Sequence, residues 1–364
     1  MSFDKLCLSI QSDFVQKFGT VIEELEAWSE EELFYRRWYE LRNDKKALSK
    51  FFDSLDPVFL KTPYLVTPDY IAQRKNEYLM PEAQYFNSDK MNRNVLLIKR
   101  NRYSPPINHR HEFFEIIIIL QGQCTNTIAG KRMVMPAGSL CFIAPDTYHH
   151  TEVFDDDTIF VYLMIKHSTF DEVFVSLLAS SDILSRFFIR NVYKKNPEYL
   201  IFNIADDKYL LEQFLAMLVE QNVNDEKTGR IMESQLLIFF SMLMRKYGNS
   251  PLVYEQVGIK EQYWEIIAYI NKHFRTLTHA KLAEKFNLSV AYCSRIIKSI
   301  TGKNFTVLVN DLRMNQARSM LSQSDAKIYD ISFSLGYEDQ GTFIRNFKKA
   351  HGITPAQYRK NNTG

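Results

Sequence analysis

Glycine, proline and cysteine are scarce in this chain, and long apolar runs are missing. The 364 residues include only 12 Gly and 11 Pro, which leaves little room for low-complexity linkers. The apolar stretch Leu236–Met244 is far shorter than the roughly 20 residues that a membrane-spanning helix needs. The N-terminus is acidic and lacks the basic-then-apolar pattern of a secretory signal. We therefore expect a cytoplasmic protein with no membrane segment.

The cysteines argue against a secreted, disulfide-bonded scaffold. Cys7, Cys124, Cys141 and Cys293 are scattered along the chain and include no Cys-x-x-Cys pair. Such a distribution does not build a disulfide framework or a Cys-rich metal site. We expect buried thiols in a reducing compartment.

The composition is that of a globular protein, and the charge is unevenly distributed. Hydrophobic residues make up 46% of the chain and charged residues 24%, and a length of 364 residues predicts two or three domains. Residues 264–364 contain 15 basic and 7 acidic residues, a net charge of +8. The preceding residues contain 30 basic and 36 acidic residues, a net charge of −6. A basic C-terminal unit is typical of proteins that bind a polyanion.

The spacing of the apolar residues divides the chain into segments. Spacings of three and four predict helices before residue 88 and again after about residue 169, with Gly248-Asn249-Ser250-Pro251 as a break. Six short runs between turn signals predict a β-barrel or sandwich: Val95–Lys99, Phe113–Leu120, Cys124–Ile128, Arg132–Met135, Ser139–Ala144 and Thr158–Ile165. We expect a multidomain α+β chain with a helical segment at 1–88, a β-barrel domain at 89–168, a helical region at 169–247, a linker at 248–262 and an all-α domain at 263–364.

The basic C-terminal domain contains an internal repeat. Ser294-Arg295-Ile296-Ile297-Lys298 before Gly302 matches Ile344-Arg345-Asn346-Phe347-Lys348 before Gly352 at an offset of 50 residues. Upstream, Asn287 and Gly336 stand where a tight turn needs a residue that tolerates positive φ. Ser289 and Asp339 stand where the next helix needs an N-cap oxygen. The repeat predicts two helix-turn-helix units.

The second helix of each unit has the two faces of a DNA-recognition helix. In the first, apolar residues form one stripe, and Ala291, Ser294, Arg295 and Lys298 lie on the other face. In the second, Phe343 and Phe347 face inward, and Gln340, Thr342, Arg345 and Lys348 are the candidate contacts with DNA. Small residues allow close approach to the major groove, and arginine can donate two hydrogen bonds to a guanine edge.

Residues 266–360 resemble the DNA-binding domain of the AraC/XylS family of bacterial transcription regulators. The resemblance implies that Ala291, Ser294 and Arg295 face bases in one groove segment and Gln340, Thr342 and Arg345 in the next. It also implies double-stranded DNA, RNA polymerase and a second copy of the chain as partners. The chain departs from the family at Cys293, Ile297, Ser332 and Gly341. The matching landmarks are Leu282-Ala283, Ser289, Ser294-Arg295, Lys298, Gly302, Phe305, Arg313, Ala317, Leu321, Ile328, Ile331, Gly336-Tyr337, Phe343, Arg345, Phe347-Lys348-Lys349, Gly352, Thr354-Pro355 and Tyr358-Arg359.

The β-rich segment resembles the two signature motifs of the cupin barrel. His109, His111 and Glu115 are all odd-numbered, so on one regular strand they would share a face that lines the barrel. The motifs are His109-x-His111-x3-Glu115-x6-Gly122 and Gly130-x5-Pro136-x-Gly138.

Two imidazoles and a carboxylate can hold a divalent metal. The second motif should add a histidine three residues after Gly138, but Cys141 stands there, and His149 and His150 come too late to match it. We therefore expect no metal and no cofactor, and we predict that His109, His111 and Glu115 contact a small-molecule effector. The alternative is that they are structural residues without a ligand.

The most consistent interpretation is a sequence-specific transcription regulator, not an enzyme, with a cupin-like sensor of a small molecule. Residues 169–247 are the expected dimerisation region, because Ile231–Met244 is apolar all round. Two other functions stay open: a metal-dependent cupin enzyme fused to a DNA-binding domain, and a regulator whose sensor binds a protein. For the helical segment 1–88, capping of the barrel mouth and binding of a partner are both open.

Overall fold

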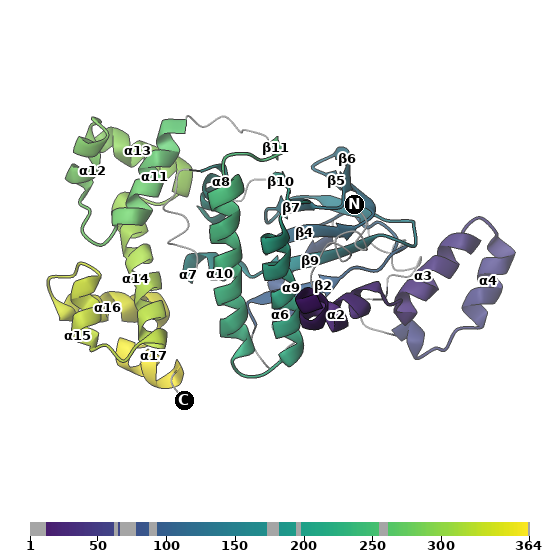
Figure 1. The fold of residues 1–364 in the computed structure, drawn as a ribbon. Helices are drawn as coiled ribbons and strands as arrows, with labels where there is room; N and C mark the ends of the chain where they lie inside the picture. The colour runs from purple at the N-terminus through teal and green to yellow at the C-terminus, as the bar shows by residue number, and fades with distance from the viewer. Residues whose placement is uncertain are drawn as a thin grey trace. The chain divides into compact units, whose positions relative to one another are not determined.

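The computed structural model describes residues 12–61, 65, 78–86, 93–172, 182–193, 198–254 and 261–362, and Figure 1 shows them as a ribbon. The chain forms two units. The first comprises residues 1–166, 197–239 and 251–255, and the second comprises residues 167–196, 240–250 and 256–364. Cys7 and part of the expected linker lie outside the described residues. Among the described helices, none combines the length and apolar character needed to cross a membrane.

The first unit is built on two β-sheets that enclose an apolar core. Alternate residues of the strands point between the sheets, among them Ile117, Ile119, Cys141 and Tyr162, all of which are buried. The six-stranded sheet has the order β11-β10-β7-β4-β9-β2, and the five-stranded sheet has the order β1-β3-β8-β5-β6. The strands are β1 (Tyr78–Met80), β2 (Val95–Lys99), β3 (His109–His111), β4 (Phe114–Gln121), β5 (Gln123–Ile128), β6 (Lys131–Pro136), β7 (Ser139–Ile143), β8 (His149–Glu152), β9 (Ile159–Ile165), β10 (Tyr199–Asn203) and β11 (Val253–Tyr254).

The β-rich domain predicted from the sequence is confirmed, with two differences. The described ladders form two open sheets, so the closure of a barrel stays a prediction. Three strands lie outside the predicted bounds of 89–168: β1 in the expected helical segment, β10 in a stretch predicted to be helical, where it pairs with β7, and β11 in the expected linker, where it pairs with β10. A five-residue apolar run such as Tyr199–Asn203 has no period that separates a buried strand from a helix, and only the pairing decides.

The helices α2 (Ser12–Glu26), α3 (Glu30–Leu41) and α4 (Lys45–Asp53) form the N-terminal segment, as predicted. The helix α2 packs against α9 (Lys208–Val223), which packs against β2. A buried carboxylate joins α3 to the sheets: Glu32 Oε1 accepts a hydrogen bond from Arg102 Nε at 2.8 Å, and Glu32 Oε2 accepts one from Lys99 Nζ at 3.0 Å. Among the residues described there, this segment also contains two short helices, η1 (Phe59–Lys61) and α6 (Glu82–Phe86).

The second unit contains the basic C-terminal domain. Within it, α7 (His167–Glu172) packs against α14, and α8 (Ile183–Tyr193) packs against α13. The residues of α10 (Thr228–Tyr247) are divided between the two units. The C-terminal helices are α11 (Glu261–His273), α12 (His279–Lys285), α13 (Val290–Thr301), α14 (Phe305–Gln323), α15 (Ile328–Ser334), α16 (Gln340–His351) and α17 (Pro355–Asn362).

Candidate DNA-binding surface and ligand-binding cavity

The helices α12 and α13 form the first helix-turn-helix unit. Asn287 in the turn has φ 52°, and the Ser289 hydroxyl caps α13 by accepting a hydrogen bond from the backbone N–H of Tyr292 at 3.2 Å. Both features were predicted and are confirmed. The predicted apolar stripe is also buried, and it consists of Cys293, Ile296, Ile297 and Ile300.

The helices α15 and α16 repeat this arrangement. Gly336 has φ 82°, and a Cβ atom at this position would lie 1.6 Å from the carbonyl oxygen of Arg275, so no other residue fits. Asp339 Oδ2 caps α16 by accepting hydrogen bonds from the Thr342 backbone N–H at 2.7 Å and from the Thr342 hydroxyl at 2.9 Å. The Thr342 hydroxyl in turn accepts a hydrogen bond from Arg345 Nη2 at 3.1 Å. Arg345 is therefore oriented before any DNA binds.

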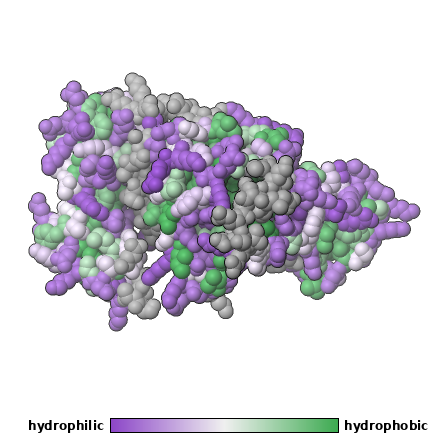
Figure 2. All heavy atoms as spheres, viewed as in Figure 1, coloured by the Kyte–Doolittle hydropathy of each residue, from purple (hydrophilic) through white to green (hydrophobic). Residues whose placement is uncertain are grey.

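Most of the predicted DNA contacts lie on the outer surface of the two recognition helices. The side chains of Ala291, Arg295, Lys298, Arg345 and Lys348 are exposed, and those of Ser294, Gln340 and Thr342 are half-buried. Two of them are already engaged within the protein: Ser294 Oγ lies 3.3 Å from Nε2 of His279, and the Thr342 hydroxyl binds Asp339. In Figure 2 the visible face of the C-terminal helices carries hydrophilic atoms with small apolar patches between them.

Sequence reasoning missed a residue that supports Arg295. The guanidinium of Arg295 lies over the ring of Tyr292, 5.2 Å from its centroid. The Tyr292 hydroxyl lies 2.6 Å from that of Tyr263, so α11 holds the ring in place. The signal in the sequence was the tyrosine three positions before the arginine, one helical turn away.

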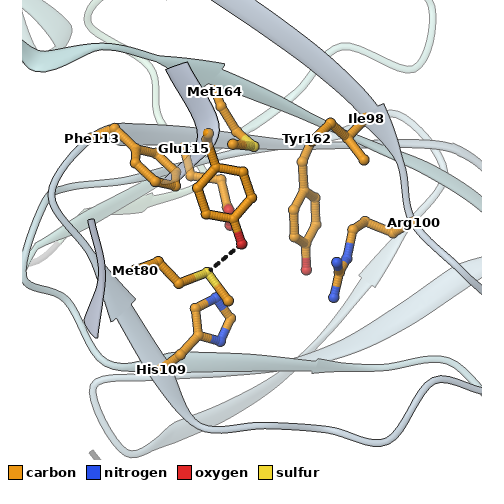
Figure 3. A pocket seen from close by; sticks show the side chains of 9 residues that line it. Met80, Ile98, Arg100, His109, Phe113, Glu115, Tyr162 and Met164 are labelled. Atoms are coloured by element: carbon orange, nitrogen blue, oxygen red, sulfur yellow. Dashed lines mark hydrogen bonds between the residues drawn. The ribbon is translucent and has the colours of Figure 1, made fainter. Parts of the chain in front are cut away.

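The first unit contains a cavity between its two sheets. The volume inside it that a water-sized sphere can occupy is about 20 Å³, which is room for one or two water molecules. Figure 3 shows the polar side chains of His109, Glu115, Tyr162 and Arg100 beside apolar ones in this cavity. The complete lining consists of Met80, Tyr85, Ile98, Arg100, His109, Phe113, Glu115, Tyr162 and Met164.

The structure corrects the prediction that His109, His111 and Glu115 share the face of one strand. The two histidines lie on β3 in the five-stranded sheet, and Glu115 lies on β4 in the six-stranded sheet. The chain bends at Glu112 and Phe113 between the two strands, so the alternation of faces starts again. His109 and Glu115 nevertheless both line the cavity, because they face it from opposite sheets. His111 is fully buried and does not line it.

His149 is the residue of this cluster that sequence reasoning set aside. It pairs with His109 across the β3–β8 ladder, and its Nε2 lies 3.0 Å from Oε1 of Glu115. A shift of the second cupin motif by eight residues reveals it, since Gly138-x5-Ala144-x-Asp146-x2-His149 has the same spacing. Asp146 occupies the second glycine place and has φ 60°, so it adopts the conformation for which glycine is usual.

The backbone fixes the tautomer of all three histidines. The Nδ1 atoms of His109, His111 and His149 lie 2.8, 2.6 and 3.1 Å from the carbonyl oxygens of Ile107, Phe113 and Thr147. Because a carbonyl oxygen only accepts, each Nδ1 carries hydrogen. The Nε2 lone pair of His111 is then buried with no partner among the described residues. Both nitrogens of His149 lie beside an oxygen that accepts hydrogen bonds. Both contacts are satisfied only when each nitrogen carries hydrogen, or when a cation takes the place of the hydrogen on Nε2.

Burial and neighbouring charge act on these groups in opposite directions. Burial by itself raises the pKa of Glu115, but the charge and hydrogen bond of His149 outweigh it and lower this pKa to about 2. Burial lowers the pKa of His111 to about 4 and that of His109 well below its usual value. At neutral pH the cluster therefore contains a carboxylate and two neutral imidazoles.

The donor set also fits a divalent metal ion. One ligand atom each from His109, Glu115 and His149 lies within 4.8 Å of the other two. Two imidazole nitrogens and a carboxylate are a common set for iron, zinc or manganese. The carbonyl groups that accept from each Nδ1 are the outer partners that metal-bound histidines usually have.

Two family models match different parts of the chain. Residues 99–238 match the AraC-like ligand binding domain, and residues 282–361 match a helix-turn-helix domain. The chain is 25% identical to the HTH-type transcriptional activator RhaS of Klebsiella pneumoniae over 256 residues, which cover 69% of this chain and 87% of that protein. It is also 25% identical to RhaS of Mannheimia succiniciproducens over 255 residues, which cover 69% of this chain and 88% of that one.

Solved structures of similar proteins cover either the C-terminal domain or most of the chain. The C-terminal domain of the response regulator yesN from Fusobacterium nucleatum is 35% identical, covers 26% of this chain and 93% of that one, and has a TM-score of 0.25. ToxT from Vibrio cholerae is 17% identical, covers 74% of this chain and 98% of that one, and has a TM-score of 0.30. With an AraC-like ligand-binding domain followed by two helix-turn-helix units, the chain belongs to the AraC family and is a DNA-binding transcription regulator.

Proposed function

We propose that the cavity between the two sheets binds the effector of this regulator, with His109 and Glu115 in contact with it and His111 as their buried neighbour. The observation that carries this proposal is a cavity lined by charged and polar groups within the core of the ligand-binding domain. Buried polar groups are costly unless something pairs with them. An effector with oxygen or nitrogen atoms would supply partners for the side chains that face the cavity. The closed cupin-like barrel is part of this proposal.

A short stretch of the chain connects the cavity to the unit that contains the DNA-binding helices. Tyr162 and Met164 on β9 line the cavity, and α7 begins two residues after β9 ends. The helices α7 and α8 pack against α14 and α13. A ligand that shifts β9 would therefore act on the helices that support the first recognition helix. The ligand can shift this equilibrium only by its differential affinity for the two states.

On DNA, we infer that α13 and α16 enter two successive major-groove segments. The helix α14, with 19 residues, joins the two helix-turn-helix units. At about 1.5 Å per residue it spans nearly one turn of the duplex. In this arrangement Arg295 and Arg345 face bases, as do Ala291, Ser294, Gln340 and Thr342. Lys298 and Lys348 lie where each helix passes the backbone. A footprint with a single protected groove segment per subunit would contradict this model.

The chain acts as a cytoplasmic homodimer in this proposal, and the region 169–247 supplies the dimer contact. Large apolar side chains on α9 and α10 are exposed, with Val223 57% and Ile238 46% accessible. Exposed apolar residues on adjacent helices favour association of two copies. Because the similar RhaS proteins are named activators, we also propose activation of transcription through contact with RNA polymerase.

A second candidate for the same cluster is a divalent metal ion held by His109, Glu115 and His149. The specific observation is that the backbone holds His109 and His149 with hydrogen on Nδ1, which leaves Nε2 for a ligand bond. A bound ion would supply Lewis-acid chemistry or a coordination position for an effector oxygen. This candidate keeps open a metal-dependent cupin activity.

Mapping of the genomic DNA bound by the protein is the first experiment, because the neighbouring genes indicate the effector panel. Glu115→Gln should then abolish the response of a reporter to the effector, while residues 262–364 alone still bind the operator. Measurement of metal in the purified protein separates the two candidates. Stoichiometric iron, zinc or manganese that is lost in His149→Ala would establish the metal site and contradict the metal-free reading.

A further inference from the structure

The helix that precedes both helix-turn-helix units contacts the first recognition helix. The helices α11 and α13 pack against each other, and they lie side by side in Figure 1. The first turn of α11 contains Tyr263. The hydroxyls of Tyr263 and Tyr292 lie 2.6 Å apart, and the two rings meet edge to face with their centroids 6.4 Å apart. A hydrogen bond and an aromatic contact therefore both fix the ring of Tyr292 against α11.

The residue next to Tyr263 anchors the first turn of α11. Trp264 is only 3% exposed, and the guanidinium of Arg190 on α8 lies 5.1 Å from the centroid of its ring. Because a buried indole loses a large contact area when it moves, Trp264 holds this turn in place. The hydroxyl of Tyr263 therefore meets Tyr292 from a fixed backbone.

Tyr292 passes this restraint on to Arg295, one turn further along α13. The guanidinium of Arg295 lies 5.2 Å from the centroid of the Tyr292 ring, and the arginine is exposed. The negative face of an aromatic ring attracts a guanidinium, although only weakly where water has access. So weak an attraction orients the arginine only while the ring itself stays fixed.

The corresponding arginine of the second recognition helix is oriented from within its own helix. Arg345 Nη2 donates a hydrogen bond to the Thr342 hydroxyl at 3.1 Å, and this hydroxyl donates to Asp339 Oδ2 at 2.9 Å. All three residues belong to α16 or to its N-cap. The orientation of the arginine on α13 depends on a neighbouring helix, whereas that of the arginine on α16 does not.

We propose that Tyr263 is a positioning residue that acts through Tyr292 to set the base discrimination of Arg295. Tyr263 lies before the matched helix-turn-helix domain, which begins at residue 282. An oriented guanidinium loses less freedom when it forms two hydrogen bonds to the correct base, and a wrong base gains nothing from that orientation. This inference rests on the proposed function, because it takes Arg295 to face a base.

The test compares the base preferences of full-length variants. Bound duplexes are selected from a pool of the mapped operator in which each position is randomised, and each preference is measured as a ratio of bound sequences. Arg295→Ala and Arg345→Ala first identify the position that each arginine reads. Tyr263→Phe should then lower the preference at the Arg295 position by about 2–10-fold and leave the Arg345 position unchanged.

Further variants locate the effect in the bond between the two tyrosines. Tyr292→Phe removes the same hydrogen bond from its other end and keeps the ring beneath Arg295, so it should reproduce the change. The double variant Tyr263→Phe/Tyr292→Phe should discriminate no worse than either single variant, because the same bond is lost only once. Tyr269→Phe is the matched control, since it removes a hydroxyl from the same helix, where the ring packs against Phe286. Its base preferences should equal those of the wild type, and urea melts confirm that each variant is folded.

The outcomes separate this inference from the proposed function. If Arg295→Ala changes one position and Tyr263→Phe does not, the positioning role is wrong and the base-facing assignment of Arg295 stands. If Tyr263→Phe lowers the preferences at the Arg295 and Arg345 positions alike, the residue supports only the fold and the inference is overturned. If Arg295→Ala leaves every preference intact, the base-facing assignment of α13 fails together with the inference.

Discussion

Replacement of Arg345 by alanine tests the base-facing assignment of α16. The arginine is exposed in the free protein, so its removal should leave the stability of the fold unchanged. A bidentate contact from arginine to a guanine edge contributes about 1–3 kcal/mol of discrimination. We therefore expect Arg345→Ala to raise Kd on the operator by a factor of roughly 5–150. Binding to scrambled DNA should change much less.

The hydrogen bond from Arg345 to Thr342 allows a second, smaller perturbation. Thr342→Val removes the hydroxyl that holds the guanidinium but keeps the arginine and the backbone cap by Asp339. Ordering a free side chain on binding costs about 0.5–1.5 kcal/mol, which corresponds to a factor of about 2–12 in Kd. In an Arg345→Ala background, Thr342→Val should change Kd little further, because the threonine hydroxyl no longer has an arginine to hold.

The assay is fluorescence anisotropy of a labelled operator duplex and of its scrambled counterpart over a series of salt concentrations. Lys348→Ala serves as the control for a backbone contact: it should weaken both duplexes alike and reduce the salt slope by about 0.9. Equal losses on operator and scrambled DNA for Arg345→Ala would refute the assignment of this residue to a base.

Three further substitutions test the fold and the buried cluster. Gly336→Ala should destabilise the protein by about 2–4 kcal/mol in urea melts, because the new Cβ meets the Arg275 carbonyl oxygen and φ is positive; Gly302→Ala, where no atom lies within 4 Å, should cost only about 1–2 kcal/mol. Ser332→Ala should stabilise the protein by about 1 kcal/mol, because the Ser332 hydroxyl is buried with no partner among the described residues; a loss of stability would show that the hydroxyl is bonded. Folding lowers the pKa of His111 from 6.5 to about 4, so as pH falls the unfolded chain binds a proton at this residue before the folded chain does. The stability that is present above pH 6.5 is therefore lost progressively down to about pH 4. His111→Gln should reduce the dependence of the free energy of unfolding on pH in this window.

The DNA-binding domain was predictable in detail because its determinants are local. The caps Ser289 and Asp339 and the turn residues Asn287 and Gly336 each act on atoms a few residues away. The buried stripe of α13 repeats at the period of the helix itself. What the sequence did not show is which outward residue is already engaged, as Ser294 is with His279 on the preceding helix.

The presence of the β-rich domain could be predicted from the sequence, but the arrangement of its buried histidine cluster could not. Face assignment by odd and even numbers holds only within one strand, and the bend at Phe113 between β3 and β4 ended it. His149 joins the cluster through a pairing with His109 that spans forty positions of sequence. The shifted cupin motif that contains His149 can be found only by a search that allows Asp146 at the second glycine position. That position needs a positive φ and not a particular side chain.

The adjacent residues Lys99 and Arg100 show where such reasoning can be extended. In the sequence they are two of 45 basic residues and differ in nothing that predicts a role. Their parity alone says that they face opposite sides of the sheet, and the ion pair of Lys99 with Glu32 identifies which side is outside. The surroundings of Arg100 then depend on what the neighbouring strands β9 and β4 of the same sheet present to it, namely the ring of Tyr162 and the Glu115 carboxylate, whose Oε1 also lies 3.0 Å from His149. The surroundings of a charged residue in a sheet are thus set by the strands that flank it, a property of the packed sheets that the sequence of one strand does not show.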